Sequence, residues 1–573
     1  MKLNKFFLAG SVLAASLSLG SCVGDLDLLP TNPDDITASQ FASDPRGFLE
    51  KSMADVYLQY ATYGANGNQT LGNIDGGMTT FQRSIFILSE IPTDEANWLA
   101  SNSNTDYGWF QFGIVPASNN LMMGTYSKFM VNVAICNQFM QTVNEGFYNL
   151  NTPELVALKD EFFRQARILR AAAYYYAIDN FGNVPWADVD VAMGQIAPQL
   201  STDMKEGRRL VTNKVVADLE EIVDWYKEND PNNIPPYGYV GLDVAEALLV
   251  KFYLNFEVYT GTAAWDKCFD HAQAIIARLG NGGFNNSGLC QNYFSNFGSN
   301  NKDYVIGGSG DGNEIIWTIP QSVTKDGVGL ISYANSTFMV NAWITTAPGD
   351  ADWKIDVKDY NANTGWKCMS ARPQLVEKFT WNEATMETSN DVRVKYWKTS
   401  KDGFQLGYDP NALLEQAYYG SNGYIPMKYS NWYEGDNGQD KDLSPKNPGN
   451  ELGGDYAMIR LAEIYLSAAE AALNGAGAHS VAVDYVNLIR ERAGLSDLGD
   501  INLTQLQDER VRELYTECVR RTDLVRYGKW ISGYNWNWKG HTYEGIDLAP
   551  QLEVYPLPST VVARNGYQQN PGY

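Results

Sequence analysis

Aromatic side chains in turn-rich sequence are the residues of this chain best suited to hold a ligand. The chain has 15 Trp, 35 Tyr and 23 Phe, and many lie in stretches rich in Gly, Asn and Asp, such as NTDYGWFQFG and YNWNWKGHTYEG. A folded core accounts for much of this content. Aromatic rings in loops, however, often form flat binding faces. The composition therefore predicts a binding surface built from aromatic loops.

The sequence carries no motif of a known catalytic site. It has only three His residues, and it lacks H-E-x-x-H, G-x-S-x-G, G-x-G-x-x-G and P-loop patterns. A glycoside hydrolase stays open as an alternative, because such an enzyme needs only two well-placed carboxylates and the chain has 67 acidic residues. No pair among these can be chosen from the sequence, so no catalytic residue is assigned.

No cofactor or metal-ligand set is indicated. The cysteines after position 22 are scattered and include no C-x-x-C pair, so neither a zinc site nor a disulfide framework is expected. Two oxygen-rich loops, 308–314 and 434–442, could hold a structural Ca²⁺. Neither loop has the spacing of an EF-hand, and we interpret both as solvated acidic turns.

The amino-terminal residues predict export and lipid attachment. Residues 1–21 combine two lysines, an apolar run and small residues, as a secretory signal does, and Cys22 follows directly. A cysteine at this position is typical of a bacterial lipoprotein, in which the signal is removed and the thiol is acylated; an ordinary signal with a chance cysteine is the alternative. Acyl chains contribute about 0.8 kcal/mol per buried methylene, so they would hold the protein on a membrane. Residues 22–35 would then be a lipidated tether to a folded domain over residues 36–573.

The charge of the chain argues against one class of partner. Its formal net charge is −24, so nucleic acid and anionic lipid are not expected to bind. A neutral ligand suits such a surface better than a polyanion. After the signal, no stretch approaches eighteen consecutive apolar residues, so no further membrane span is expected.

Apolar residues recur at helical spacing in several long segments. Residues 151–182 begin with the cap-like Thr152-Pro153-Glu154 and stop at Gly182. Further expected helices come in pairs, at 242–261 with 263–280 and at 456–475 with 479–495. Paired helices with alanines at their contacts resemble tetratricopeptide repeats. The predicted fold class is therefore mainly α.

The sequence between the helix pairs is long, irregular and rich in Gly, Asn, Asp and aromatic residues. We predict helical repeats at about 151–280 and 455–530 as a scaffold. A large loop-rich, aromatic-rich excursion, with the ligand region at about 60–120 and 281–450, is mounted on it. A few strand candidates such as NEIIWTIP interrupt the loops. Arg520 and Arg521, with Glu513, Glu517 and Asp523 nearby, are interpreted as an ion-pair network on one helix face that belongs to the scaffold.

Five motifs spread over the whole chain occur in an order that is typical of one family. They are CVGDLDLLP, RAAAYYYAIDNFGNVPW, MIRLAEIYLSAAEAA, ERVRELYTECVRRTDLVRYGKW and VYPLPSTVVARNGYQQNPGY. Together they resemble the SusD/RagB family, the surface glycan-binding lipoproteins of Bacteroidetes. The resemblance implies a helical repeat fold, an outer-membrane location facing outward, and no enzymatic activity. It also implies a SusC-like TonB-dependent transporter as the partner, to which captured oligosaccharide is passed.

Three segments are similar to the starch-binding members of that family in particular. FQRSIFILSEIPTDEANW (81–98) matches the segment of the first platform aromatic and implies Trp98 and Arg83 as ligand contacts. GLISYANSTFMV (329–340) matches the segment that supplies a platform tyrosine, here Tyr333, and GWKCMSARPQLVEKF (365–379) matches the segment that supplies Trp366.

The resemblance is incomplete just beyond Trp98. Starch-binding members have a second Trp where this chain has Ala100, so the curvature of the aromatic row stays open. The polar contact that follows is assigned to Asn102, with Ser103 as the alternative register.

The implied site suits sugar chemistry. A sugar ring has an apolar C–H face, on which Trp98, Tyr333 and Trp366 would stack, and an equator of hydroxyls, which Arg83 and Asn102 would bind. Each residue also has a plainer interpretation, because most Trp residues pack in a core and most Arg residues pair with a carboxylate. A lid that binds peptide or protein instead of glycan is a further alternative.

Overall fold

The protein is built mainly from α-helices, which confirms the predicted fold class. The computed structural model describes residues 44–62, 76–98, 105–144, 150–191, 195–321, 335–344, 357–362, 365–366, 368–379, 389–404, 423–434, 441–442 and 453–573. The helices are α3 (Pro45–Ala61), α4 (Phe81–Ser89), α5 (Thr105–Gln111), α6 (Asn120–Asn144), α7 (Pro153–Phe181), α8 (Met204–Asn229), α9 (Leu242–Leu254), α10 (Phe256–Thr260), α11 (Trp265–Leu279), α12 (Asn335–Asn341), α13 (Pro373–Lys378), α16 (Leu461–Ala471), α17 (His479–Arg492), α18 (Leu503–Leu514), α19 (Arg520–Arg526) and α20 (Ser559–Asn565). The strands are β1 (Ala96–Trp98), β2 (Ile315–Ile319), β3 (Met369–Ala371), β4 (Tyr433–Glu434), β5 (Lys441–Asp442) and β6 (Tyr456–Arg460).

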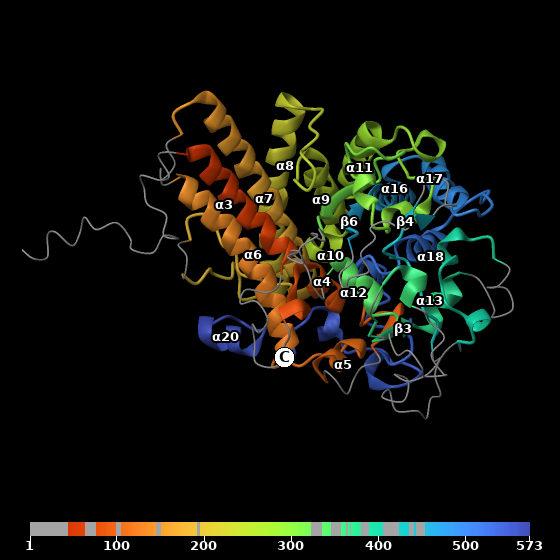
Figure 1. Cartoon of the computed structure of the whole chain (residues 1–573). Helices are drawn as coiled ribbons and strands as arrows, with labels where there is room; N and C mark the ends of the chain where they lie inside the picture. The colour runs from red at the N-terminus through yellow and green to blue at the C-terminus, as the bar shows by residue number, and fades with distance from the viewer. Residues whose placement is uncertain are drawn as a thin grey trace, which may run out of the picture.

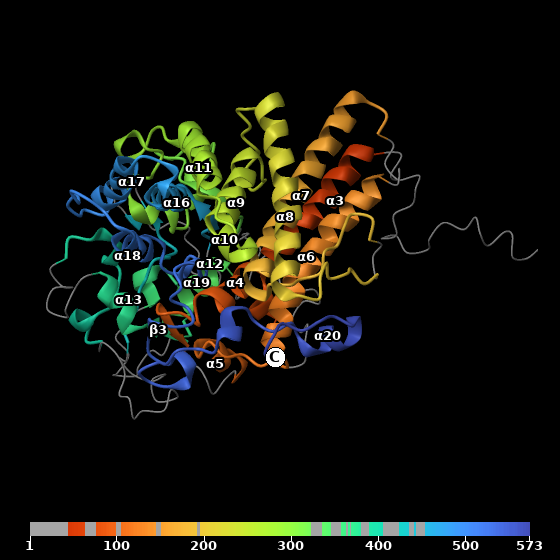
Figure 2. The same cartoon turned by 180° about the vertical axis from the view of Figure 1, so that it is seen from behind.

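Four long helices, α3, α6, α7 and α8, stand side by side on one flank of the molecule (Figures 1 and 2). Helix α7 begins and ends where the sequence predicts. The Thr152 hydroxyl accepts a hydrogen bond from the Leu155 amide at the start, and Gly182 ends the helix with a φ of 65°. In the part of the chain that the structure describes, none of the helices combines the length and apolarity that a membrane span requires.

The two predicted helix pairs pack against each other on the side of the molecule away from α3 (Figure 2). Helices α9 and α10 are separated from α11 by Gly261, which has a φ of 80°. Helix α16 lies against α9 and α11, with Ala468 and Ala469 fully buried, and α17 packs back on α16. The small side chains permit this close approach, as expected from their spacing.

One predicted helix begins later than expected. Residues 456–460 form strand β6, which pairs antiparallel with β2, and the helix starts only at Leu461. All residues of both strands are buried. The strand candidate NEIIWTIP is confirmed as β2. The prediction of a helix over the whole of 456–475 was wrong, because pairing with this distant strand outweighs the local helical preference.

The region at about 60–120, expected as loops, contains two helices. All nine residues of α4 are buried, so its continuous apolar run is a core helix and not a binding loop. The Thr80 hydroxyl caps it by accepting a hydrogen bond from the Arg83 amide. The stretch NTDYGWFQFG is largely helix α5.

Buried ion pairs hold the loop-rich region on the helical scaffold. Arg460 is buried, and its guanidinium contacts Glu314, Glu513 and Glu517, with Nε 2.7 Å from Glu517 Oε2. Arg492 pairs with the same Glu314, at 2.6 Å, and with Glu513. Burial alone would raise the pKa of Glu314, but Arg492 and Arg460 outweigh it and lower that pKa to about 2. The Glu314 carboxyl is therefore ionised in the folded protein.

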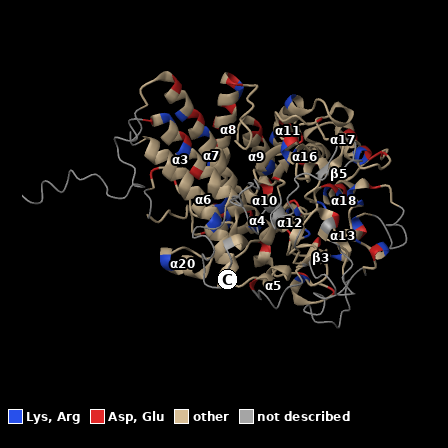
Figure 3. Ribbon diagram, viewed as in Figure 1, with Lys and Arg blue, Asp and Glu red and all other residues tan. Residues whose placement is uncertain are grey.

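The network continues through Arg393, which is also fully buried. Its guanidinium lies 2.8 Å from Asp391 and from Glu509, and it reaches Glu513 at 3.3 Å. It thereby joins segment 389–404 to α18. Basic and acidic segments lie close together over this part of the ribbon (Figure 3).

The ion pairs of Arg520 differ from the prediction. Arg520 binds Asp94, across the molecule, through two contacts of 2.7 Å. The expected partners Glu513 and Glu517 face Arg460 instead. The prediction that these charges share one helix face was wrong. Helix α18 ends at Leu514, and the backbone turns at Thr516 and Cys518, whose φ values are 62° and 66°.

Two carboxyls are buried together in the turn between α4 and β1. Burial and the neighbouring Glu95 raise the pKa of Glu90 well above its usual 4.5, and burial raises the pKa of Glu95 to about 7. Glu95 also accepts a hydrogen bond from the Thr516 amide at 2.8 Å. The pair therefore favours protonation, unlike Glu314, which faces Arg460.

We expect Arg460→Ala to lower the free energy of unfolding by about 3–5 kcal/mol, because it leaves three carboxylates in the interior without their shared cation. Urea denaturation followed by circular dichroism measures this. The matched control is Arg209→Ala, which removes an exposed ion pair with Glu206 and should leave the curve almost unchanged. Equal curves for the two variants would show that the network contributes nothing.

We expect Glu90→Gln to flatten the pH dependence of stability. A carboxyl whose pKa is raised on folding stabilises the protein at low pH, and this stabilisation is lost as the pH rises from 4.5 through the folded pKa, which is about 7 for Glu95 and well above 4.5 for Glu90. Melting temperatures of wild type and variant between pH 5 and 9 measure this. The wild type should lose more stability than the variant as the pH rises; parallel profiles would contradict a protonated pair.

Candidate functional site

Three segments predicted to carry ligand contacts come together in the fold. Strand β1 pairs antiparallel with β3, which places Trp98 opposite Met369. The carbonyl of Asn341, at the end of α12, accepts a hydrogen bond of 2.6 Å from the Trp366 amide. The neighbouring Ala342 carbonyl accepts one of 2.7 Å from Cys368. The segments of Trp98, Trp366 and the helix that follows residue 333 therefore adjoin, near α5, α12 and β3 in Figure 1.

Trp98 lies at one end of a series of contacting flat side chains. Its ring is parallel to that of Tyr107, with centroids 4.0 Å apart and 9° between planes. The Tyr107 hydroxyl accepts a hydrogen bond of 2.9 Å from Nε of Arg83. The guanidinium of Arg83 lies 4.3 Å over the ring of Phe338, from α12. Trp98 and Arg83 are thus held in one cluster by a residue from α5.

The exposed surface of Trp98 in this cluster is too small for a sugar ring to stack on it. Only 3% of Trp98 is exposed, because Tyr107 covers one face of its ring and the remaining neighbours enclose it. Trp366 is half-buried and packs against the core while keeping part of its surface in solvent. Among the predicted aromatics that the structure describes, Trp366 is therefore the one whose surface a ligand reaches first.

The other predicted contacts lie outside the described residues. These are Tyr333, Asn102 with its alternative Ser103, and the lipidation site Cys22. Ala100, where starch-binding members have a second Trp, also lies outside them.

Two aromatic residues near the site were not singled out by the sequence. The ring of Tyr107 stacks on that of Trp98, and Trp109, in the same helix, is 41% exposed. At about 100° per residue, Trp109 points some 200° away from Tyr107 around α5, so it faces away from the stack. The seven residues of α5 were too few to show a helical period, and this hid the division between a supporting and an exposed ring.

Buried polar contacts anchor the strand that carries Trp98. Asp94 binds Arg520 just before β1, and this cation lowers the pKa of Asp94 although burial acts in the opposite direction. Arg372, directly after β3, is fully buried and donates to the carbonyls of Ala96, at 2.8 Å, and of Gln111, at 3.1 Å. One arginine therefore ties β1, β3 and α5 together.

The described residues include no group of three or more His, Cys, Asp or Glu side chains arranged to hold a metal. In the loop 308–314, Asp311 accepts a hydrogen bond of 3.0 Å from the Gln291 amide. Most of the loop 434–442 lies outside the described residues.

Comparison with known proteins agrees with the resemblance seen in the motifs. Residues 313–573 match the model of the SusD family. The whole chain is 27% identical to the starch-binding protein SusD of Bacteroides thetaiotaomicron, of which it covers 99%.

Solved structures share the fold. A SusD superfamily protein from Parabacteroides distasonis superposes with a TM-score of 0.64 at 19% identity, over 92% of this chain and 99% of that one. Surface glycan-binding protein A from Bacteroides thetaiotaomicron, in complex with laminarihexaose, gives a TM-score of 0.60 at 16% identity over the same shares. Residues 313–573 thus match the SusD family in sequence, and the chain as a whole is similar to SusD proteins in sequence and in fold.

Proposed function

We propose that this protein is a cell-surface lipoprotein that captures an oligosaccharide or polysaccharide and delivers it to a SusC-like TonB-dependent transporter. The observation that carries the proposal is the convergence of β1, β3 and the end of α12, which brings Trp98, Arg83 and Trp366 into one region. Relatives named for starch binding and for glycan binding support the same ligand class. Binding and transfer without catalysis are the activity proposed.

The chemistry of the region suits a neutral sugar. The half-buried ring of Trp366 offers an apolar surface for the C–H face of a pyranose, with Tyr333 as a further platform contact. Arg83 and Asn102 are the proposed donors to its hydroxyls, at about 0.5–1.5 kcal/mol net for each hydrogen bond. Because only 3% of Trp98 is exposed, we assign it a supporting role: its ring stacks on Tyr107, which accepts a hydrogen bond from Arg83.

A starch-like glucan is the proposed ligand, on the strength of the full-length similarity to a starch-binding protein. A curved row of aromatic rings suits a helical α-glucan, and a flat row suits a β-linked chain. Single contacts of this kind are weak, so repeated contacts along a polymer and confinement at a membrane would raise the effective affinity.

We expect Trp366→Ala to weaken polysaccharide binding at least about tenfold, because truncation of a central aromatic anchor typically costs 1.4–2 kcal/mol or more. Native affinity electrophoresis of residues 23–573 through gels containing amylopectin, dextran, xyloglucan, xylan, mannan or levan measures this. Trp98→Phe, which keeps most of the packing, should weaken binding less than Trp366→Ala.

The matched control for these variants is Trp265→Ala, because Trp265 is also half-buried but starts α11, away from the site. Unchanged retardation of Trp366→Ala would remove it from the site. Retardation only by a polysaccharide other than amylopectin would keep glycan capture and discard the starch assignment. Release of reducing ends would establish a glycoside hydrolase, and binding of peptides without any glycan would establish a peptide lid.

We expect Cys22→Ala to release the protein from the outer membrane, because the substitution removes the thiol that would carry the acyl chain. Membrane fractionation of cells that produce each form, followed by immunoblotting, measures this. Ser21→Thr, which keeps the cysteine, is the control and should stay with the membrane. A Cys22→Ala protein that still fractionates with the outer membrane would contradict lipid anchoring.

A further inference from the structure

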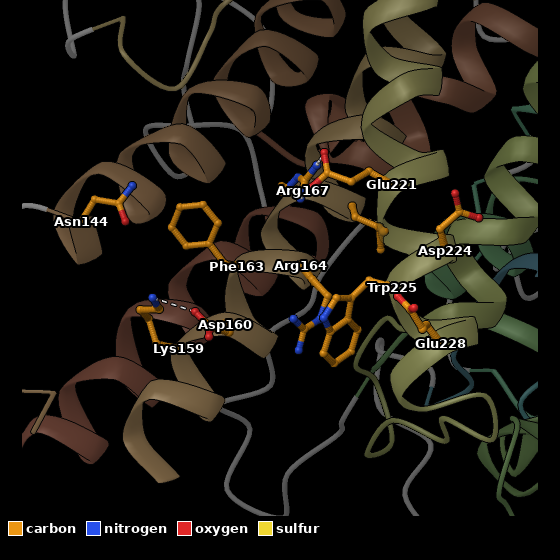
Figure 4. Close-up of a pocket in the computed structure, with 11 residues that line it drawn as sticks. Asn144, Lys159, Asp160, Phe163, Arg164, Arg167, Glu221, Asp224, Trp225 and Glu228 are labelled. Atoms are coloured by element: carbon orange, nitrogen blue, oxygen red, sulfur yellow. Dashed lines mark hydrogen bonds and ion pairs between the residues drawn. The ribbon is translucent and has the colours of Figure 1, made fainter. Parts of the chain in front are cut away.

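A groove between α7 and α8 holds a second exposed tryptophan, far from the region of β1 and β3 (Figures 1 and 4). The groove has a volume of about 570 Å³. Trp225, in the last turns of α8, is 37% exposed. Figure 4 shows it beside Arg164, with charged side chains of both helices around it.

The ring of Trp225 is held in place from one side. The guanidinium of Arg164 lies 3.4 Å from the ring centroid, and Tyr226 meets the ring nearly edge-on at 5.3 Å. Arg164 is itself fixed by Glu161, which accepts hydrogen bonds of 3.2 and 2.9 Å from it and one of 2.8 Å from the Tyr226 hydroxyl. The indole is therefore oriented before any ligand arrives, which reduces the entropy lost on binding.

The rim of the groove offers both donors and acceptors. Lys159 and Arg167 are cations that already face Asp160 and Glu221, at 2.7 and 3.1 Å. Asp224 and Glu228 flank Trp225 on the exposed side of α8. A polyanion would meet these carboxylates and a cationic partner would meet the guanidinium groups, whereas a neutral polyhydroxyl ring can use both.

We propose that this groove is a second glycan contact, in which one pyranose ring stacks on the exposed surface of Trp225 and its hydroxyls bind Asp224 and Glu228. The ligand class rests on the function proposed above, but the site is separate from it. Two contacts on distant faces of one protein would hold a long polysaccharide more tightly than either contact alone, through a raised local concentration of the second site. A short oligosaccharide cannot reach both.

The test compares wild type, Trp225→Ala, Trp366→Ala and the double variant in the same panel of polysaccharide gels. We expect Trp225→Ala to weaken retardation by about threefold to tenfold. The double variant should lose the retardation that Trp366→Ala retains. Trp225→Tyr, which keeps a flat ring, should restore much of the loss, and Trp265→Ala is again the control.

A second variant guards against a folding defect in Trp225→Ala. The double change Asp224→Ala with Glu228→Ala removes only exposed side chains, so it should weaken retardation and leave the melting temperature unchanged. If the wild type is retarded and both groove variants behave like it, the second contact is wrong while the proposed function stands. If no polysaccharide retards the wild type, both proposals are overturned.

Discussion

The fold depends on charges that are buried in the protein interior and paired there. A buried guanidinium needs partners that replace the water it has lost, and Arg460 finds them in three glutamates, Glu314 from one distant segment and Glu513 and Glu517 from another. Because Glu513 is shared with Arg492 and Arg393, displacing any one of these segments would leave another charge unpaired. The network therefore fixes how the loop-rich middle of the chain sits on α17 and α18.

The same kind of contact reaches the candidate site. Arg520 in α19 forms an ion pair with Asp94, which lies just before β1. Arg372, which directly follows β3, donates hydrogen bonds to carbonyls of β1 and α5. The aromatic stack of Trp98 and Tyr107 thus rests on a rigid base, although it lies among irregular connections. Preorganised aromatic surfaces bind sugars with little loss of side-chain freedom, so the buried ion pairs bear directly on recognition. The Trp225 groove achieves a similar rigidity at the surface, where Glu161 fixes Arg164.

Features set by local sequence were predictable. The limits of α7 follow from Thr152 and Gly182, and β2 follows from its run of β-branched and aromatic residues. Features set by distant partners were not. Strand β6 was taken as helix because its partner lies far away in the chain, and the pairing of Arg520 with Asp94 has no signal near either residue.

The candidate site shows the same division. Similar segments identify Trp98, Arg83 and Trp366 from the sequence, and the structure places these three in one region. The burial of Trp98 could not be foreseen, because it depends on Tyr107 from a helix of only seven residues. The exposure of Trp225 could not be foreseen either, because a single Trp in a helix normally packs in a core.

The most direct measurement is a crystal structure of residues 23–573 with a bound oligosaccharide from the polysaccharide that the protein retains. A glycan site at the junction of β1, β3 and α12 predicts a pyranose ring over Trp366, with carbon atoms within about 4 Å of the indole, and a hydroxyl bound to Arg83. A sugar bound only at surfaces remote from residues 81–98, 335–344 and 365–379 would contradict it.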